Sequence, residues 1–244
     1  MDVCLSAGKI MLKSGAETYR VEDTMSRIAE AFHAERVHAF VTPTAIILSS
    51  GGPEPHSDKT KFIRITERAN DLHKVSLVNE ISRKVSNGIL TLKETERELE
   101  SVEKADFSFP VWQQIVAAAL VSGCFLLMFQ GVWHDIVPAL ITGGVGYAVF
   151  IYFHRLVQVK FFSEAFASFC IGLIAAGMVA AGAGVQLDKI ITGSVMPLVP
   201  GVLITNAVRD LMAGHLISGL SRGAEALLTA TAIGTGVAVV IILF

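Results

Sequence analysis

The sequence predicts an α-helical membrane protein with about five transmembrane helices, preceded by a small α+β cytoplasmic domain. Hydrophobic residues make up 52% of the 244 residues and charged residues only 17%, whereas soluble domains carry about 25% charged residues. The charges are also unevenly placed, because residues 1–110 hold 15 of the 20 Lys and Arg and 17 of the 22 Asp and Glu. We therefore expect a polar domain over 1–108 and a transmembrane domain over 109–244.

The polar domain shows both helical and strand periodicity. Apolar residues spaced by three and four predict helices, and a capping box formed by Thr91 and Glu94 begins the last of them. Alternating residues predict two strands, and a short apolar run between them is typical of a strand buried on both faces. Gly51-Gly52-Pro53 and Pro55 predict a loop. The expected helices cover about 3–14, 16–34, 70–86 and 91–104, and the expected strands 37–42, 44–49 (the one buried on both faces) and 61–66.

Five apolar stretches in the second domain are long enough to cross a bilayer, which takes about 20 residues in a helix. They cover about 111–129, 134–153, 162–184, 190–208 and 222–244. The start of the chain lacks the pattern of a cleaved signal peptide. Lys and Arg lie in the links near 157 and 215, the link at 129–134 has none, and the single Lys189 in the link at 185–189 is the one departure from this alternation. The positive-inside rule then predicts a multi-pass protein of the plasma (inner) membrane, with a cytoplasmic N-terminus and a C-terminus outside.

Small residues recur at a spacing of four along the third span, at Gly172, Ala176, Ala180 and Gly184. Close contact between small residues associates helices in lipid. The stripe therefore indicates either packing among the five helices or a seam for a second subunit.

The fourth span contains the strongest candidate for a binding site. Pro197, Pro200 and Gly201 should break this helix, and interrupted helices often form the substrate sites of transporters. A half-helix that begins near Gly201 would point its positive N-terminal end at a substrate carboxylate. The polar residues that follow are Thr205, Asn206 and Asp210, of which the last two share a helix face. The other interpretation is a proline kink used only for packing.

Other chemical signals are weaker. Glu164 and Glu225 lie at the expected inner ends of the third and fifth spans, and intramembrane acids are often functional. Gly8-Lys9 lacks the surroundings of a P-loop, and the histidines lack a metal-ligand spacing. We expect no enzyme activity, no catalytic residue, no metal and no cofactor. A net charge of -2 without a basic stripe argues against a nucleic-acid partner.

Several short motifs in order resemble the threonine/serine exporter family. They are Gly15-Ala16-Glu17-Thr18-Tyr19-Arg20-Val21-Glu22, Val41-Thr42-Pro43-Thr44-Ala45-Ile46, Pro200-Gly201, Asn206-Ala207, Asp210, Gly214, Gly219 and Arg222. The resemblance implies an exporter with a cytoplasmic domain followed by five spans. Some family members carry about ten spans in one chain, and others are split into two chains. This chain resembles the larger half of a split pair, which implies a second membrane subunit of four or five spans. The substrate class is threonine and serine or, for some split pairs, the dicarboxylate succinate.

The leading hypothesis is therefore a subunit of a secondary, proton-driven exporter of a small carboxylate-bearing metabolite. Pro200, Gly201, Thr205 and Asn206 would bind the substrate. Asp210 would couple transport to protons or pair with an ammonium group, and Arg209 or Arg222 would hold the second carboxylate of a dicarboxylate. The alternative hypothesis is a membrane-anchored regulatory or sensory protein whose cytoplasmic domain binds a ligand.

Overall fold

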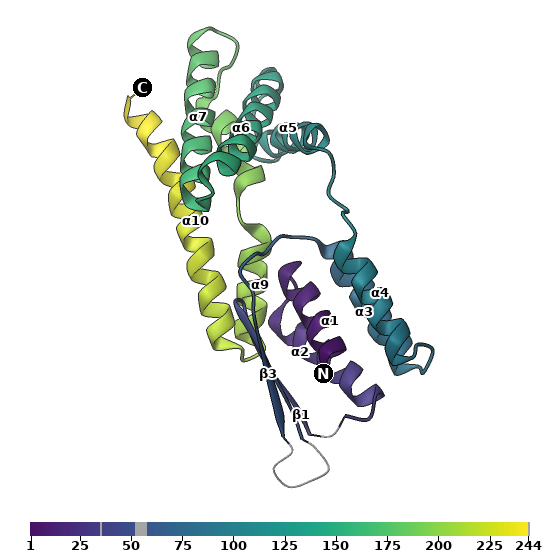
Figure 1. Cartoon of the computed structure of the whole chain (residues 1–244). Helices are drawn as coiled ribbons and strands as arrows, with labels where there is room; N and C mark the ends of the chain where they lie inside the picture. Colours follow the sequence, from purple (N-terminus) through teal and green to yellow (C-terminus); the bar gives the residue numbers. More distant parts are fainter. Residues whose placement is uncertain (35, 52–57, 244) are drawn as a thin grey trace. The chain divides into compact units, whose positions relative to one another are not determined.

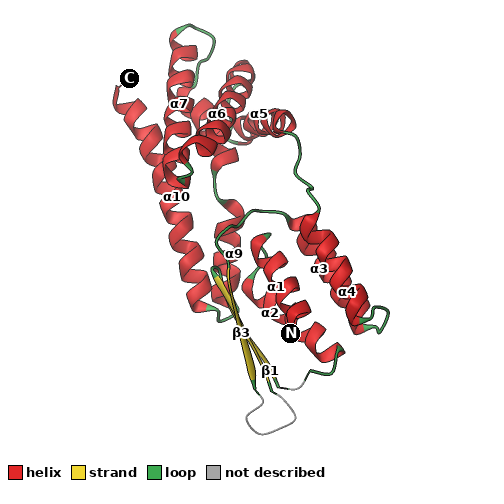
Figure 2. Ribbon diagram, in the orientation of Figure 1, coloured by secondary structure: helices red, strands yellow, loops and turns green. Residues whose placement is uncertain are grey.

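The computed structural model describes residues 1–34, 36–51 and 58–243, which form two compact units. The first unit contains residues 1–107 and 202–223, and the second contains residues 108–201 and 224–244. Figures 1 and 2 show that most of the chain is helical and that the strands form one small sheet. The loop expected around Gly52, Pro53 and Pro55 lies outside the described residues.

The first unit contains most of the expected elements of the polar domain and, in addition, a helix from the C-terminal part of the chain. Its sheet is antiparallel with the strand order β1-β2-β3. The helices are α1 (Asp2–Lys13), α2 (Thr18–Ala31), α3 (Leu72–Ser86), α4 (Leu92–Lys104) and α9 (Gly201–Met212, from its second residue), and the strands are β1 (Val37–Thr42), β2 (Ala45–Ser50) and β3 (Lys59–Arg64).

Only one face of the sheet is covered, so the expectation that 44–49 is buried on both faces is wrong. Ile46 and Leu48 of β2 lie in the core of the unit, whereas Ile47 between them is exposed. Phe40 of β1 and Phe62 of β3 pair with Ile47 across the sheet, and both are also exposed. The short apolar run therefore reflects an exposed cross-strand row of apolar side chains and not a second covering layer.

The capping box predicted at the start of α4 is confirmed. The Thr91 backbone N–H donates to the Glu94 carboxylate at 2.8 Å, and the Thr91 hydroxyl donates to the same carboxylate at 2.7 Å. Gly88 ends the preceding helix with a φ of 70°, a conformation that favours glycine. Both ends of the connection between α3 and α4 are thus set by local chemistry.

The second unit consists of apolar helices and includes most of α10 (Leu216–Leu243), whose residues 216–223 belong to the first unit. Asp135 is fully buried and accepts hydrogen bonds from the backbone N–H groups of Val185 and Gln186, at 2.7 and 2.9 Å. It thereby satisfies donors of the link that precedes α8. The other elements of the unit are α5 (Val111–Met128), η1 (Trp133–Asp135), α6 (Ile136–Val157), α7 (Lys160–Ala180), α8 (Leu187–Val195) and η2 (Met196–Leu198).

Four helices of the described chain are long and apolar enough to cross a membrane, and a bent pair raises the number to five. The bent pair joins Leu187–Leu198 to Gly201–Met212 at an angle of 62°. This confirms the expected break at Pro197, Pro200 and Gly201. The first arm measures about 18 Å at 1.5 Å per residue, which is shorter than the roughly 30 Å hydrocarbon core.

The small-residue stripe of α7 is partly used inside the second unit. A Cβ atom at Gly172 would press against Val240 of α10, and Ala176 is buried. Gly177, on a neighbouring face, has open space where a side chain would point. The stripe therefore packs against α10 near Gly172, and the surface at Gly177 stays available.

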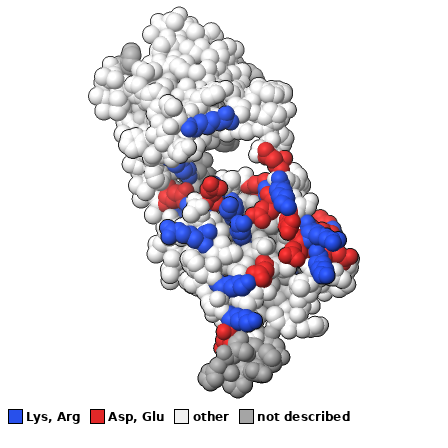
Figure 3. All heavy atoms as spheres, in the orientation of Figure 1, with Lys and Arg blue, Asp and Glu red and all other residues white. Residues whose placement is uncertain are grey.

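Charged side chains gather over the first unit on the face seen in Figure 3. The second unit shows a mostly uncharged surface there, and its helices expose large apolar side chains such as Trp112, Leu156 and Ile242. A surface of this kind is suited to lipid or to another apolar protein.

Candidate functional site

The turn between α1 and α2 is the centre of the candidate site. Gly15 adopts a φ of 85° between the helices expected over 3–14 and 16–34, and an added Cβ would collide with the Asn70 side chain. Ala69 N–H donates to Lys13 O at 2.7 Å and anchors the turn to the chain before α3. The turn therefore needs glycine at position 15 and has little freedom to shift.

Helix α9 directs two polar side chains at this turn. Asn206 and Asp210 are buried and share one face of the helix, as their spacing predicted. The Asn206 side-chain amide donates to Gly15 O at 2.8 Å. Asp210 accepts a hydrogen bond from the Thr18 backbone N–H at 2.9 Å and another from the Thr18 hydroxyl at 3.1 Å.

Asp210 thus caps a helix that is distant in sequence. Thr18 is the first residue of α2, and the preceding Glu17 makes no side-chain capping bond of its own. The first N–H groups of a helix lack partners within the helix, and a carboxylate is favoured at this positive end. Asp210 supplies that carboxylate from 192 residues further along the chain.

Arg222 completes the buried cluster from α10. Its Nη2 donates to Ala16 O at 2.7 Å, and its Nη1 lies 3.4 Å from Asp210 Oδ2. Arg222 is 4% exposed and Asp210 is 0% exposed. We call the groups of Thr18 and Arg222 that surround the Asp210 carboxylate, namely an N–H group, a hydroxyl and a guanidinium, the carboxylate cradle.

A second ion pair lies at the edge of the cradle. The Glu17 carboxylate, itself buried, pairs with Arg209 of α9 and with Arg20 of α2. Burial raises the pKa of Glu17, but a backbone N–H hydrogen bond and the two arginines outweigh it, so the pKa lies below its usual value. Glu17 is therefore ionised at neutral pH.

Glu22 lies one turn further along α2. It accepts a hydrogen bond from Val41 N–H at 2.9 Å and lies 3.9 Å from His215. Burial raises the pKa of Glu22, against the opposing effects of the Val41 N–H group and of His215, and the negative charge of Asp210 raises it further. The first unit thus places an acid of lowered pKa at the N-cap of α2 and an acid of raised pKa in the second turn of the same helix.

The structure brings together only part of the residue set predicted from the sequence. Asn206, Asp210 and Arg222 meet around the α1–α2 turn, whereas Pro200 and Gly201 belong to the second unit. Thr205 is exposed on α9. The prediction missed Thr18, the direct partner of Asp210, although Thr18 lies within the first motif quoted for the family resemblance.

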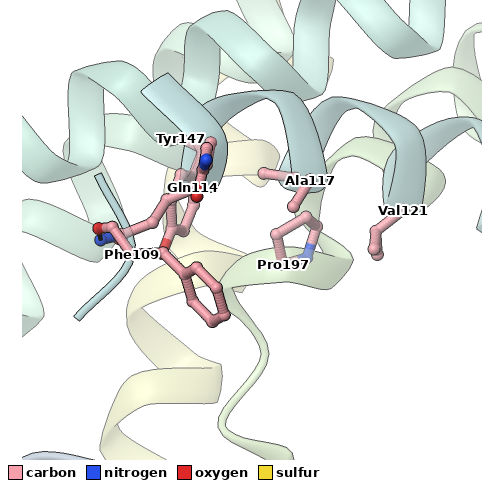
Figure 4. Close-up of a pocket in the computed structure, with 8 residues that line it drawn as sticks. Phe109, Gln114, Ala117, Val121, Tyr147 and Pro197 are labelled. Carbon is pink, nitrogen blue, oxygen red and sulfur yellow. Dashed lines mark hydrogen bonds between the residues drawn. The ribbon is translucent and has the colours of Figure 1, made fainter. Parts of the chain in front are cut away.

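A separate hollow of about 520 Å³ lies in the second unit beside the break in the bent pair. Figure 4 shows Phe109, Gln114 and Tyr147 toward one end of it, and Ala117, Pro197 and Val121 along the rest. The Gln114 side-chain amide donates to Phe109 O at 2.7 Å, so one of its two N–H groups is already engaged. The nearly apolar wall suits an acyl chain or an apolar side chain better than a carboxylate.

Within the described residues, no group of three or more His, Cys, Asp or Glu side chains could hold a metal ion. The chemistry that the first unit offers is anion binding by an N–H group, a hydroxyl and a guanidinium. These groups hold a carboxylate by charge-assisted hydrogen bonds.

Comparison with known proteins agrees with a transport role. The chain is 28% identical to a protein of Klebsiella aerogenes named probable succinate transporter subunit YjjP, over 95% of this chain and 90% of that protein. The protein of the same name from Escherichia coli is 25% identical, over 96% of this chain and 91% of that protein. A probable threonine/serine exporter of Mycobacterium tuberculosis is 20% identical over 97% of this chain but only 45% of its own length. No solved structure matches the chain.

A family model for a threonine/serine exporter matches residues 2–244, which is nearly the whole chain. These three relatives are named as transporter subunits or an exporter and not as enzymes, and the apolar helices identify a multi-pass membrane protein. The chain belongs to the threonine/serine exporter family.

Proposed function

We propose that this chain is the larger subunit of a two-part secondary exporter of a small carboxylate-bearing metabolite, with a dicarboxylate as the favoured class. Relatives named as succinate transporter subunits are matched over about nine tenths of their length. A relative named as a threonine/serine exporter is matched over less than half. These proportions favour a second membrane subunit, of four or five spans, that supplies the remaining half of the transporter.

The carboxylate cradle is the observation that carries the proposed substrate chemistry. Its N–H group, hydroxyl and guanidinium bind the side chain of Asp210, and the same groups can bind the carboxylate of a metabolite. Asp210 then acts as an internal competitor that occupies the cradle when no substrate is present. Arg209, which is half exposed and pairs with Glu17, is the candidate partner for a second carboxylate.

This competition suggests how protons would be coupled to transport. A proton on Asp210 removes its negative charge and weakens its attraction to Arg222. The guanidinium can then pair with a substrate carboxylate, so acid should strengthen binding of the anion. Asp210 therefore remains our candidate for proton coupling, and Asn206 holds the α1–α2 turn in place while the cradle changes its occupant.

The bent pair supports a further part of this proposal. Pro200 and Gly201 separate the short arm from α9, and backbone groups freed at such a break are tolerated at membrane depth only against protein or water. We propose that the substrate passes this break, with Thr205 exposed on the first turns of α9. The charged first unit then lies on the cytoplasmic side of the inner membrane and the C-terminus lies outside, as the positive-inside rule predicts.

The test is counterflow of labelled succinate, threonine and serine in proteoliposomes that contain this chain with or without the second subunit. We expect succinate exchange only when both chains are present. Arg209→Gln should reduce exchange of a dicarboxylate more than exchange of a zwitterion, because only the dicarboxylate has a second carboxylate that loses its partner. Exchange at full rate by this chain alone would disprove the two-part assembly. If none of the three substrates exchanges with both chains present, the proposed function is wrong.

A further inference from the structure

Glu164 is a buried acid of the second unit that the carboxylate cradle does not use. It lies in the second turn of α7 and is only 2% exposed. Within the part of the chain that the structure describes, its Oε2 atom has no hydrogen-bond partner. A charged carboxylate in such a place is costly, because membrane burial removes the water that would solvate it.

A buried hydroxyl faces this acid from a different helix. Thr229 of α10 is 0% exposed and lies close enough to Glu164 to interact with its carboxyl group. The Thr229 hydroxyl also has no hydrogen bond of normal geometry among the described residues. Helices α7 and α10 are closely packed near this point, because a Cβ at Gly236 would collide with the backbone at Ala165 and Phe169. Two unsatisfied polar groups therefore face each other in a tightly packed apolar interface.

The surrounding charges are already paired with one another. Lys160, one turn before Glu164 on α7, lies 3.1 Å from Glu225 of α10. From α6, His154 Nδ1 lies 3.5 Å from the hydroxyl of Ser163. Glu164 thus has an ion pair and a histidine ring in its neighbourhood, but neither makes a direct hydrogen bond to its carboxylate among the described residues.

We propose that Glu164 is a proton-binding residue of the second unit and gives up its proton during the transport cycle. The hydroxyl of Thr229 suits this role, because a hydroxyl can accept from a protonated carboxyl and donate to an ionised one. A small movement of α10 along α7 would form either hydrogen bond. The proton comes from water and returns to water. The transport step of this inference rests on the proposed function, whereas proton binding does not.

Proton binding is tested directly by infrared titration of the purified chain in lipid. We expect a carbonyl band of a protonated carboxylic acid that disappears as the pH is raised and that is missing from Glu164→Gln. Thr229→Val should shift the frequency of this band, because the acid loses its hydroxyl partner. Asp188→Asn is the matched control and should leave the band in place, since Asp188 is exposed on α8. Identical carboxylic-acid bands in the wild type and in Glu164→Gln at every pH would overturn the proposal.

The transport role is tested with the second subunit present. Glu164→Gln imitates the protonated acid, so it should keep substrate exchange while net transport driven by a pH gradient falls at least tenfold. An equal loss of exchange and net transport would indicate a structural role and overturn the coupling step, as would net transport that follows a sodium gradient and not a pH gradient. If the wild type transports nothing while the infrared band behaves as expected, the proposed function fails and the proton site stands.

Discussion

Removing the charge of Asp210 should loosen the α1–α2 turn more than it disturbs any other part of the first unit. Asp210→Asn leaves Arg222 buried beside a neutral group, and breaking a buried ion pair from one side costs about 3–5 kcal/mol. Typical domains are stable by only about 5–15 kcal/mol. The single substitution should therefore consume a large share of the stability of the first unit.

The double variant Asp210→Asn/Arg222→Met measures how much of the destabilisation in Asp210→Asn comes from leaving the buried Arg222 charge unpaired. An apolar side chain of similar length removes the unpaired buried cation, and replacing a buried pair by apolar residues is often neutral or stabilising. We expect the double variant to be more stable than Asp210→Asn alone by about 2 kcal/mol or more. Arg222→Met alone leaves Asp210 with its two hydrogen bonds to Thr18. Its stability should therefore lie between that of Asp210→Asn and that of the double variant.

The Thr18 amide gives the most local measurement. A hydrogen bond to a charged group contributes about 1.5–3 kcal/mol, so its loss should speed amide exchange of Thr18 roughly tenfold to 150-fold. Hydrogen–deuterium exchange of peptides that cover the turn measures this change in Asp210→Asn. Asp188→Asn removes one acid of an exposed pair and should leave the exchange of Thr18 unchanged. Unchanged protection of Thr18 in Asp210→Asn would refute the claim that this carboxylate caps α2.

Three further predictions address assembly, pH and topology. Gly177→Leu should leave the isolated chain folded but weaken its co-purification with the second subunit, because the added side chain points into open space. Gly172→Leu, whose side chain would collide with Val240, should instead destabilise the chain itself. Equal co-purification of the wild type and Gly177→Leu would exclude this surface from the subunit interface. The raised pKa of Glu22 means that its contribution to stability is fully present below its ordinary value of 4.5 and is lost as the pH rises through its folded value. The unfolding temperature of Glu22→Gln should accordingly depend less on pH than that of the wild type between pH 4.5 and the folded pKa of Glu22. An unchanged pH profile would contradict this prediction. If the bent pair crosses the membrane, an impermeant thiol reagent should label a cysteine added at the C-terminus of a cysteine-free variant from outside whole cells. Labelling only after lysis would place the C-terminus inside and make the bent pair a re-entrant segment.

The helices and the break in the bent pair were predictable because they depend on local chemistry. Apolar runs of about 20 residues require a helix in lipid, and Pro197 and Pro200 cannot continue one. The capping box of Thr91 and Glu94 is likewise contained within four residues. In each of these cases the residues that determine the structure are neighbours in the sequence.

The cradle could be predicted only in part because its partners are distant in the sequence. The spacing of Asn206 and Asp210 correctly placed both on one face of α9. Nothing in that spacing reveals that the face meets Thr18, which lies 192 residues earlier. The prediction that β2 is buried on both faces failed for a similar reason. A short apolar strand does not indicate whether a second layer covers Ile47. Long-range contacts decided both outcomes.

The location of the cradle has a consequence for the role of the first unit. Two of the motifs that resemble those of the exporter family, around Gly15–Thr18 and Asn206–Asp210, form a single buried cluster. A domain that only supported assembly would not need to bury an ion pair there, because such a pair contributes little to stability compared with apolar side chains of similar size. A change of occupant in the cradle would alter both the α1–α2 turn and α9, which is the second arm of the bent pair. Under the proposed function, the first unit would therefore act as a gate that responds to the carboxylate bound at the start of α2, with Asp210 holding it in one state and the substrate holding it in the other.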